Sequence, residues 1–326
     1  MRLHCLVLCV CCVHSLSLSE TQAEDPVFVQ GTVPERLWNE GEFTEGVAVR
    51  SDGLVFFSDI PSDAKKSGRI LAFDPATKKT LVFCRKSGKS NGLAFDSGDR
   101  LLACCGANGG SRALCEITES GDVKPLVGMF DGHPFNSPND LVVHPNGMVY
   151  FTDPRYVGSE PLELRGMGVY RFDPETNVVS LEMSTARKPN GVEVSPDGKT
   201  LYVAETDNGS SGIPGQAPGR KGRMQLLAFN VAKDGRLSNA RVLVEFGKEN
   251  GIDGMAVDAL GRIFAAVRSE WRFGIAVYDP AGIELDFVKT ESLPTNCGFG
   301  AGNDASTLYI TAGGGLFRVP VKSAVR

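Results

Sequence analysis

The sequence predicts an all-β fold, a six-bladed β-propeller with four-stranded blades. One hairpin pattern, an oxygen-bearing residue followed by two short apolar runs and a tight turn between them, recurs six times along the chain. A second apolar segment follows each copy, and a further run follows most of them. No convincing helical pattern separates the copies. Four-stranded units repeated six times are typical of a propeller, whereas a β-sandwich would not explain so regular a repeat.

The clearest copy of the repeat runs from Asn136 to Pro154. It consists of a polar loop to Asp140, an apolar run over residues 141–143, a turn at residues 145–147 and a second apolar run from Met148 to Phe151. Two short strands joined by a Pro/Asn/Gly turn indicate a β-hairpin. The other full copies open at Glu45, Asn91, Asn190 and Asp253, and a degenerate sixth opens near Asn296.

Two segments lie outside the regular repeat. Residues 24–39 contain strand-like pieces, which we expect to complete the last blade, because closure of the ring leaves no unpaired strand edge. Asp207 to Gly222 is the longest irregular insertion. We expect it to be a loop that covers one face, and we predict a single propeller domain over residues 24–326.

Residues 1–23 are predicted to be an export signal. Arg2 precedes an apolar stretch from Leu3 to Leu18 that is short for a membrane span, and small residues follow at positions 21–23. An uncleaved anchor is the alternative. We therefore expect an exported protein, periplasmic or secreted, without a membrane span after signal removal. The net charge of −5 offers no basic surface for nucleic acid.

Five cysteines remain after the predicted signal: Cys84, Cys104, Cys105, Cys115 and Cys297. Their number is odd and no pair has C-x-x-C spacing, so the sequence predicts neither a zinc site nor a disulfide framework. Most fall in apolar runs, which favours buried free thiols. A bridge from Cys104 or Cys105 to Cys115 stays open in an oxidising compartment.

The same position of each repeat, immediately before the innermost strand, carries an oxygen-bearing side chain. These residues are Glu45, Asn91, Asn139, Asn190, Asp253 and Asn296. In a propeller, equivalent positions form a ring around the central channel. Carboxylates and amide carbonyls suit Ca²⁺, with Mg²⁺ or Mn²⁺ as alternatives. Turn formation alone would also place Asn and Asp before strands, but it would use Ser and Gly as freely. We therefore predict a central metal site.

Four motifs carry a resemblance to a known family. They are Glu45-Gly46 after an aromatic residue, Asn136–Asp140 with Tyr150–Pro154, Lys188–Gly191 with Tyr202–Glu205, and Asp253-Gly254. From about Phe43 to Val319 the chain resembles senescence marker protein (regucalcin), the gluconolactonases and luciferin-regenerating enzyme.

This resemblance implies a six-bladed propeller with one divalent ion, held by Glu45, Asn139, Asn190 and Asp253. Ca²⁺ is the first expectation, with Mg²⁺, Mn²⁺ and Zn²⁺ as alternatives. It also implies that a sugar-acid or related lactone is the small-molecule substrate. Metal-activated water would open the lactone, with Asp253 as the base.

Further residues are predicted to face the substrate or orient the ligands. Asn91 and Asp140 are expected to hold water, substrate or ligands in place, and Asn136 and Asn296 to bind substrate at the rim. His133, which precedes the loop, is equally compatible with substrate binding and with a plain surface position. His144 is expected in a solvated turn. Glu193 is expected to line the channel, with a satisfied buried carboxylate as the alternative.

Two other functions remain open. Regucalcin-type sequences have an arginine two residues before the asparagine that matches Asn139, where this chain has Ser137, so sugar-lactone specificity is in question. A non-catalytic calcium-binding or ligand-binding propeller is the first alternative. A phosphotriesterase or arylesterase in the same pocket is the second, and a covalent serine esterase is not expected. The fold by itself does not choose between these functions.

Overall fold

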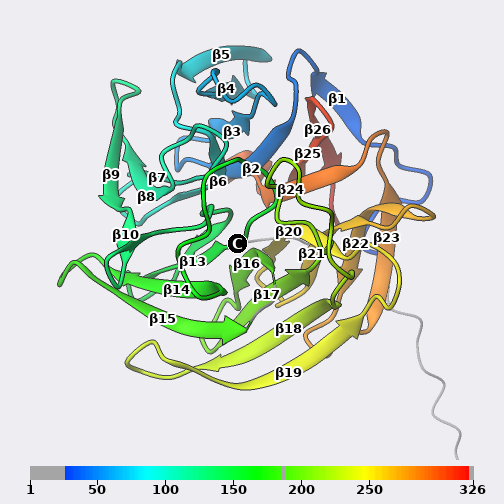
Figure 1. Ribbon diagram of the computed structural model, residues 1–326. Coiled ribbons are helices and arrows are strands. Elements are labelled where there is room, and N and C mark those ends of the chain that lie inside the picture. The colour runs from blue at the N-terminus through cyan, green and yellow to red at the C-terminus, as the bar shows by residue number, and fades with distance from the viewer. Residues whose placement is uncertain (1–25, 186–187, 323–326) are drawn as a thin grey trace, which may run out of the picture.

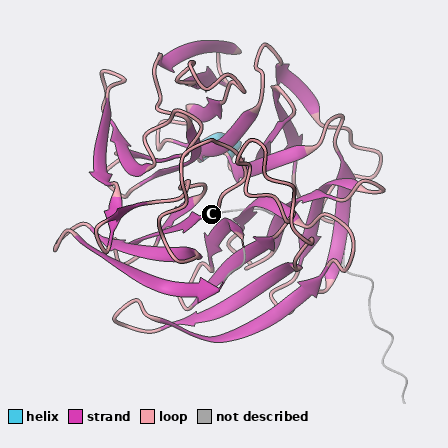
Figure 2. Cartoon of the chain, in the orientation of Figure 1, coloured by secondary structure: helices cyan, strands magenta, loops and turns pink. Residues whose placement is uncertain are grey.

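The computed structural model describes residues 26–185 and 188–322, which form six four-stranded antiparallel sheets. Figure 1 shows the sheets arranged in a ring, and Figure 2 shows how little of the chain is helical. The predicted six-bladed propeller is therefore confirmed. The predicted signal lies outside the described residues. None of the helical structure in the described part is long and apolar enough to cross a bilayer.

Each of the first five blades is built from four consecutive strands. Blade 1 contains β2 (Thr44–Val49), β3 (Val55–Asp59), β4 (Arg69–Asp74) and β5 (Lys79–Cys84). Blade 2 contains β6 (Ser90–Phe95), β7 (Leu101–Cys105), β8 (Ala113–Ile117) and β9 (Val123–Val127). Blade 3 contains β12 (Leu141–Val143), β13 (Val149–Asp153), β14 (Met167–Asp173) and β15 (Val178–Thr185). Blade 4 contains β16 (Pro189–Val194), β17 (Thr200–Thr206), β18 (Met224–Val231) and β19 (Leu237–Glu245). Blade 5 contains β20 (Ile252–Val257), β21 (Ile263–Arg268), β22 (Phe273–Tyr278) and β23 (Glu284–Lys289).

The sixth blade joins the two ends of the described chain. It contains β24 (Pro294–Phe299), β25 (Thr307–Ala312), β26 (Gly315–Pro320) and, as its outer strand, β1 (Glu35–Trp38). Figure 1 shows the blue β1 beside the red β26. A bridge between Phe28 and Val321 extends the closure. The expectation that the leading segment completes the last blade is confirmed. Two short pieces complete the structure, the hairpin of β10 (Met129–Phe130) and β11 (His133–Pro134) and the 3₁₀ turn Gly302–Asp304.

The hydrophobic core is divided among the spaces between blades. Six clusters of buried residues are found, and each takes its side chains from two neighbouring blades. Between blades 5 and 6, the ring of Phe264 meets Phe299 edge-on at 4.9 Å, and Phe28 packs on Phe264 at 6.1 Å. Because every cluster needs both blades, a blade cannot bury its apolar surface alone.

Buried hydroxyl groups connect the blades near the channel. Thr152 of β13 donates to the carbonyl oxygen of Asn190 at 2.7 Å, and Thr206 of β17 donates to that of Ile252 at 2.5 Å. Thr295 of β24 donates to the carbonyl oxygen of Thr44 at 2.7 Å, across the closure from blade 6 to blade 1. At these three junctions the bonds fix where one inner strand begins relative to the next blade.

The prediction of a solvated turn at His144 is wrong. Its side chain is buried, with Nε2 2.7 Å from the carbonyl oxygen of Gly198, and Nδ1 accepts the Asn146 N–H at 3.1 Å. The turn of blade 3 packs against the turn of blade 4, a contact that one repeat considered alone does not reveal.

The five cysteines after residue 25 are all buried and free, as the apolar runs favoured.

Ring closure by β1 generates a stability prediction. A chain starting at residue 39 lacks β1 and leaves β26 as an open edge. We expect its melting temperature to fall by about 10 °C or more, and its solutions to aggregate on heating, because unpaired strand edges recruit other chains. Thermal denaturation followed by circular dichroism measures this. A chain starting at residue 26 is the matched control, and equal melting of the two chains would show that β1 is dispensable.

Candidate functional site

The beginning of the inner strand is irregular in most blades, and the predicted site residues lie at this irregularity. In β6, β16 and β20 two residues stand opposite one residue of the partner strand, so the register shifts. The bulged pairs are Asn91-Gly92, Asn190-Gly191 and Asp253-Gly254. In β2 the shift follows Glu45. A bulge turns a side chain away from the regular alternation of a strand. These bulges accompany side chains that line the channel.

The glycine of each bulge lies against the next blade. A Cβ added to Gly191 would overlap the carbonyl oxygen of Asp253, and a Cβ on Gly254 would overlap the amide of Asn296. The missing side chains therefore allow neighbouring inner strands to converge. In blade 3, Asp140 stands in the glycine position. Its carboxylate instead accepts two backbone N–H groups, that of Val192 in blade 4 at 3.3 Å and that of the adjacent Leu141 at 3.0 Å.

These strand beginnings surround a cavity of about 670 Å³. Five of the predicted site residues line it together: Glu45, Asn91, Asn139, Asn190 and Asp253. Part of the remaining wall is apolar and comes from Phe43, Ile60, Tyr156, Val157 and Met224. The structure thus brings the four predicted metal ligands into one cavity with a mixed polar and apolar lining, as small-molecule sites usually have.

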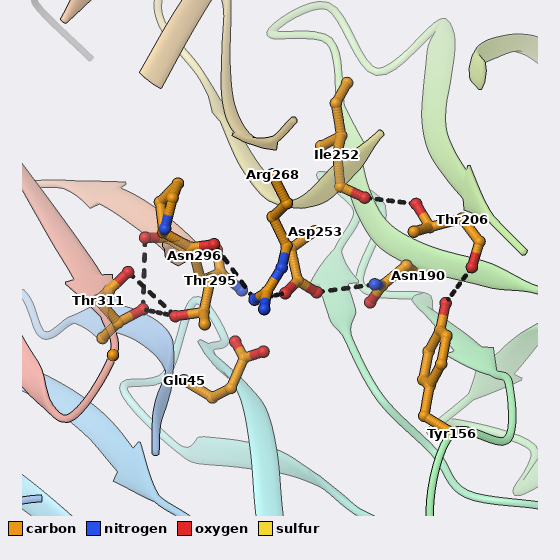
Figure 3. Close-up of polar contacts among 12 residues, drawn as sticks. Glu45, Tyr156, Asn190, Thr206, Ile252, Asp253, Arg268, Thr295, Asn296 and Thr311 are labelled. Atoms are coloured by element: carbon orange, nitrogen blue, oxygen red, sulfur yellow. Dashed lines mark hydrogen bonds and ion pairs between the residues drawn. The ribbon is translucent and has the colours of Figure 1, made fainter. Parts of the chain in front are cut away.

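Asp253 is held at both carboxylate oxygens. Asn190 Nδ2 donates to its Oδ1 at 2.7 Å, and Arg268 Nη1 donates to its Oδ2 at 2.6 Å. Figure 3 shows the carboxylate of Glu45 directed toward this pair. Burial raises the pKa of Asp253, against the opposing effects of Arg268 and Asn190. The orientation of Asp253 is therefore fixed by two side chains from two blades.

Glu45 shares this buried environment. Its side chain is almost fully buried, and Oε2 accepts the Gly46 N–H at 3.1 Å. Burial raises the pKa of Glu45 well above its usual range, and the nearby charges of Asp253 and Asp140 raise it further. Two buried carboxylates that repel one another are costly unless a cation compensates them. This arrangement favours a bound positive charge.

The donor set fits a hard divalent cation. Glu45 and Asp253 supply carboxylate oxygens, and Asn139 and Asn190 supply amide oxygens, the ligand types that Ca²⁺ prefers. Neither histidine nor cysteine is among the described residues that line the cavity. Within residues 26–185 and 188–322 no three His, Cys, Asp or Glu side chains gather as a metal site. The set of two carboxylates and two amides agrees with that finding, because only two of its four members are Asp or Glu. Its oxygen atoms still fit Ca²⁺ by ligand chemistry.

The other predicted substrate residues lie outside the cavity lining. Asn136 is buried, and its Nδ2 donates to Asp153 Oδ2 and to Gly166 O, both at 3.0 Å. The Oδ1 of Asn296 accepts the Cys297 N–H at 2.8 Å. His133 lies in β11 with half of its side chain exposed, 3.9 Å from Glu163. Asp140 binds backbone N–H groups, as described above. Substrate contacts of these four residues thus find no support in their positions.

One stretch of the chain matches a serine-esterase motif. Residues 88–92 read G-K-S-N-G, which matches the G-x-S-x-G pattern of esterases. Ser90, however, is fully buried in strand β6, and Ser58 Oγ donates to its Oγ at 2.9 Å. The esterase pattern requires an exposed serine at a turn from a strand into a helix. Ser90 therefore lacks the exposed position that this esterase pattern requires.

Arg268, the last residue of β21, is a cavity residue that the sequence reasoning missed. A signal for it exists in the repeat. In four blades, the first residue of the inner strand pairs with a residue of the second strand, and the residue that follows this partner in the chain lines the cavity. These residues are Ile60, Gly106, Thr206 and Arg268. This second ring was not recognised because its members share no chemistry. Lys89 also lines the cavity, and its ammonium group donates to the carbonyl oxygens of Pro61 at 2.5 Å and Asp63 at 2.9 Å.

The insertion over residues 207–222 is fastened beside the cavity. The buried ammonium group of Lys188 donates to Asn208 Oδ1 at 2.6 Å and to Ser210 O, and it lies 4.7 Å from the ring centre of Tyr156. Tyr156 in turn donates to Thr206 O at 2.8 Å. Burial lowers the pKa of Lys188 to about 8. Asn208 lines the cavity, so the insertion contributes to the site from one side.

A second cavity, of about 630 Å³, lies at the opposite end of the inner strands. It is lined by the turns after these strands, and Glu193 is among its residues. The expectation that Glu193 lines the channel is met, at the end away from Glu45 and Asp253. The channel therefore has two mouths with different linings.

Comparison with known proteins identifies the family. A family model described as the SMP-30/gluconolactonase/LRE-like region matches residues 43–314. The chain belongs to this family. A gluconolactonase of Zymomonas mobilis is 29% identical over 311 residues, covering 88% of this chain and 79% of the relative. The lactonohydrolase OryL of Aspergillus oryzae is 29% identical over 270 residues, covering 76% of this chain and 60% of that relative's length.

Solved structures give the same fold. A gluconolactonase from Xanthomonas campestris superposes with a TM-score of 0.75 at 26% identity, covering 92% of this chain and 98% of the other. A luciferin-regenerating enzyme, at 19% identity and a TM-score of 0.70, covers 90% of this chain and 97% of its own and shares the fold. The predicted family is therefore confirmed.

Close strand approach at Gly191 generates a prediction. In Gly191→Ala the new methyl group overlaps Asp253 O, so the beginning of β20 must move and with it the Asp253 side chain. We expect a loss of about 2 kcal/mol or more in the free energy of unfolding, measured by urea denaturation. Gly128→Ala is the control, because its nearest new neighbour is 3.6 Å away. Equal stability of the two variants would contradict the close approach.

Proposed function

We propose that this protein is a metal-dependent lactone hydrolase of the gluconolactonase type, acting on a sugar-acid or related lactone. The observation that carries the proposal is one cavity in which two buried carboxylates, Glu45 and Asp253, meet the amides of Asn139 and Asn190. Membership of the family and the lactonase names of its relatives support the same activity.

In this proposal Glu45, Asn139, Asn190 and Asp253 hold one divalent ion, Ca²⁺ by ligand type, with Mg²⁺, Mn²⁺ and Zn²⁺ as alternatives. Such an ion, when bound, polarises the lactone carbonyl and lowers the pKa of a neighbouring water. Because the ligands come from blades 1, 3, 4 and 5, the ring of blades must be closed for the set to be complete. Site and fold are therefore coupled.

Asp253 is the proposed base. It would accept the proton of the attacking water at its carboxylate, whose pKa burial raises above the ordinary value. Asn190 and Arg268 keep the carboxylate from rotating. Asn91, at the equivalent position of blade 2, presents an amide to the substrate, and Phe43, Ile60 and Met224 restrict water on the apolar wall.

One observation favours the non-catalytic alternative, a calcium-binding or ligand-binding propeller. Both oxygens of Asp253 already accept hydrogen bonds within the protein, and an aspartate paired with arginine is a weaker base. A phosphotriesterase or arylesterase would use the same cavity. Lactone and phosphotriester panels with one metal at a time separate these functions.

Metal removal tests the proposed ion. Chelator-treated protein should lose at least about 90% of its hydrolysis of glucono-δ-lactone, because the polarising charge next to Glu45 and Asp253 is gone. Proton release in weak buffer measures the rate, with Ca²⁺, Mg²⁺, Mn²⁺ and Zn²⁺ added back singly. Full activity after chelation, with metal absent by elemental analysis, would refute metal dependence. Tight ion binding without turnover of any lactone would favour the binding alternative.

Substitution tests the proposed base. Asp253→Asn keeps the size of the side chain and removes its charge, and we expect kcat to fall by about 10²-fold to 10⁴-fold. Asn146→Ala, in an exposed turn far along the hairpin from the cavity, should keep nearly full activity. Circular dichroism verifies that both variants fold. Retention of wild-type kcat by Asp253→Asn would exclude Asp253 as the base.

A further inference from the structure

Arg268 places a positive charge where the proposed ion would be held. Its Nη1 donates to Asp253 Oδ2 at 2.6 Å and also to the carbonyl oxygen of Pro294 at 3.3 Å. The side chain therefore spans from blade 5 to the beginning of β24 in blade 6. Figure 3 shows the guanidinium group lying between Asp253 and the blade 6 residues, above Glu45. About 23% of the side chain is exposed, so the pair is largely shielded from water.

The two carboxylates in the cavity act on Arg268 together. Burial alone would lower the pKa of Arg268, yet the charges of Asp253 and Glu45 raise it above its usual value. Arginine remains charged at any working pH. Without a metal ion, Arg268 is thus the permanent positive charge that compensates Glu45 and Asp253. Lys89, the other basic residue of the lining among the described residues, gives its ammonium group to backbone carbonyls instead.

A divalent ion and the guanidinium group therefore need the same carboxylate. An ion held by Asp253 would share that carboxylate with Arg268, because the guanidinium group already donates to its Oδ2. Two positive charges that share one partly buried carboxylate repel one another, because water screens them only in part. The ion also gains less from Asp253 when that charge is already shared with an arginine.

We infer that Arg268 is a built-in counter-ion, which stabilises the metal-free site and lowers its affinity for the divalent ion. This inference rests on the proposed metal-dependent function, and it adds how the affinity of that site is set. The protein then folds stably before the ion is present, and the ion binds reversibly. Removing the positive charge should tighten metal binding, whereas removing an ordinary orienting residue would weaken it.

Calorimetric titration of chelator-treated protein with Ca²⁺ tests the inference. In Arg268→Met, which keeps the length of the side chain without its charge, we expect the Kd for Ca²⁺ to fall about tenfold or more. Arg268→Lys keeps the charge and should bind Ca²⁺ nearly as the wild type does. Metal-free Arg268→Met should also melt at a lower temperature than the wild type. Added Ca²⁺ should raise its melting temperature by more than it raises that of the wild type.

Arg171→Met is the matched control. Arg171 forms an ion pair with Glu182 at 2.8 Å that is even more buried than that of Arg268, and neither residue lines the cavity. Its loss should lower stability and leave the Kd for Ca²⁺ unchanged. If Arg268→Met does not fold, Arg268→Gln provides the same test with a shorter neutral side chain.

Three outcomes separate this inference from the proposed function. Tighter Ca²⁺ binding by Arg268→Met, but not by Arg268→Lys or Arg171→Met, supports the inference. Equal or weaker binding by Arg268→Met, with clear binding by the wild type, overturns it and leaves the proposed metal site intact. Arg268 would then act on the site only by orienting Asp253. A wild type that binds none of Ca²⁺, Mg²⁺, Mn²⁺ and Zn²⁺ overturns both proposals.

Discussion

The structure depends on the convergence of the inner strands at the central channel. Where the strands begin, neighbouring blades come so close that Gly191, against the Asp253 backbone, and Gly254, against the Asn296 side chain, leave no room for a Cβ. Buried hydroxyls such as Thr152 then fasten one blade to the backbone of the next. The residue before each glycine has little choice of direction, so its side chain lines the channel. The same packing that closes the fold therefore assembles the site.

The repeat made the position of the cavity residues predictable from the sequence. Because the hairpin pattern recurs with an oxygen-bearing residue at one position, the ring of Glu45, Asn91, Asn139, Asn190 and Asp253 follows from the fold alone, and the structure places all five in one cavity. The role of leading strand β1 follows from the need to leave no open edge. Export by residues 1–23 stays a prediction, because that segment lies outside the described residues.

Residues whose roles depend on contacts between blades could not be predicted from the sequence. Asp140 occupies a glycine position and bonds to blade 4, His144 joins two turns, and Asn296 packs on Gly254. Each of these roles depends on which residue of the neighbouring blade lies opposite, and spacing along one repeat does not contain that information. Arg268 was missed for a related reason, since its equivalents Ile60 and Gly106 have unrelated side chains.

The cavity is lined by two rings of residues, the predicted oxygen-bearing ring and the second ring of Ile60, Gly106, Thr206 and Arg268. The two rings differ in how freely their side chains can vary. The first ring is restricted by close packing of neighbouring inner strands, and it presents an oxygen-bearing side chain to the cavity from each of blades 1 to 5. The second ring has room to vary, and it presents an isoleucine, a glycine, a threonine and an arginine to the same cavity. Lys89 gives its ammonium group to backbone carbonyls, so Arg268 of blade 5 is the basic residue of this cavity that pairs with Asp253. Variation in the second ring is therefore where we expect substrate preference to respond.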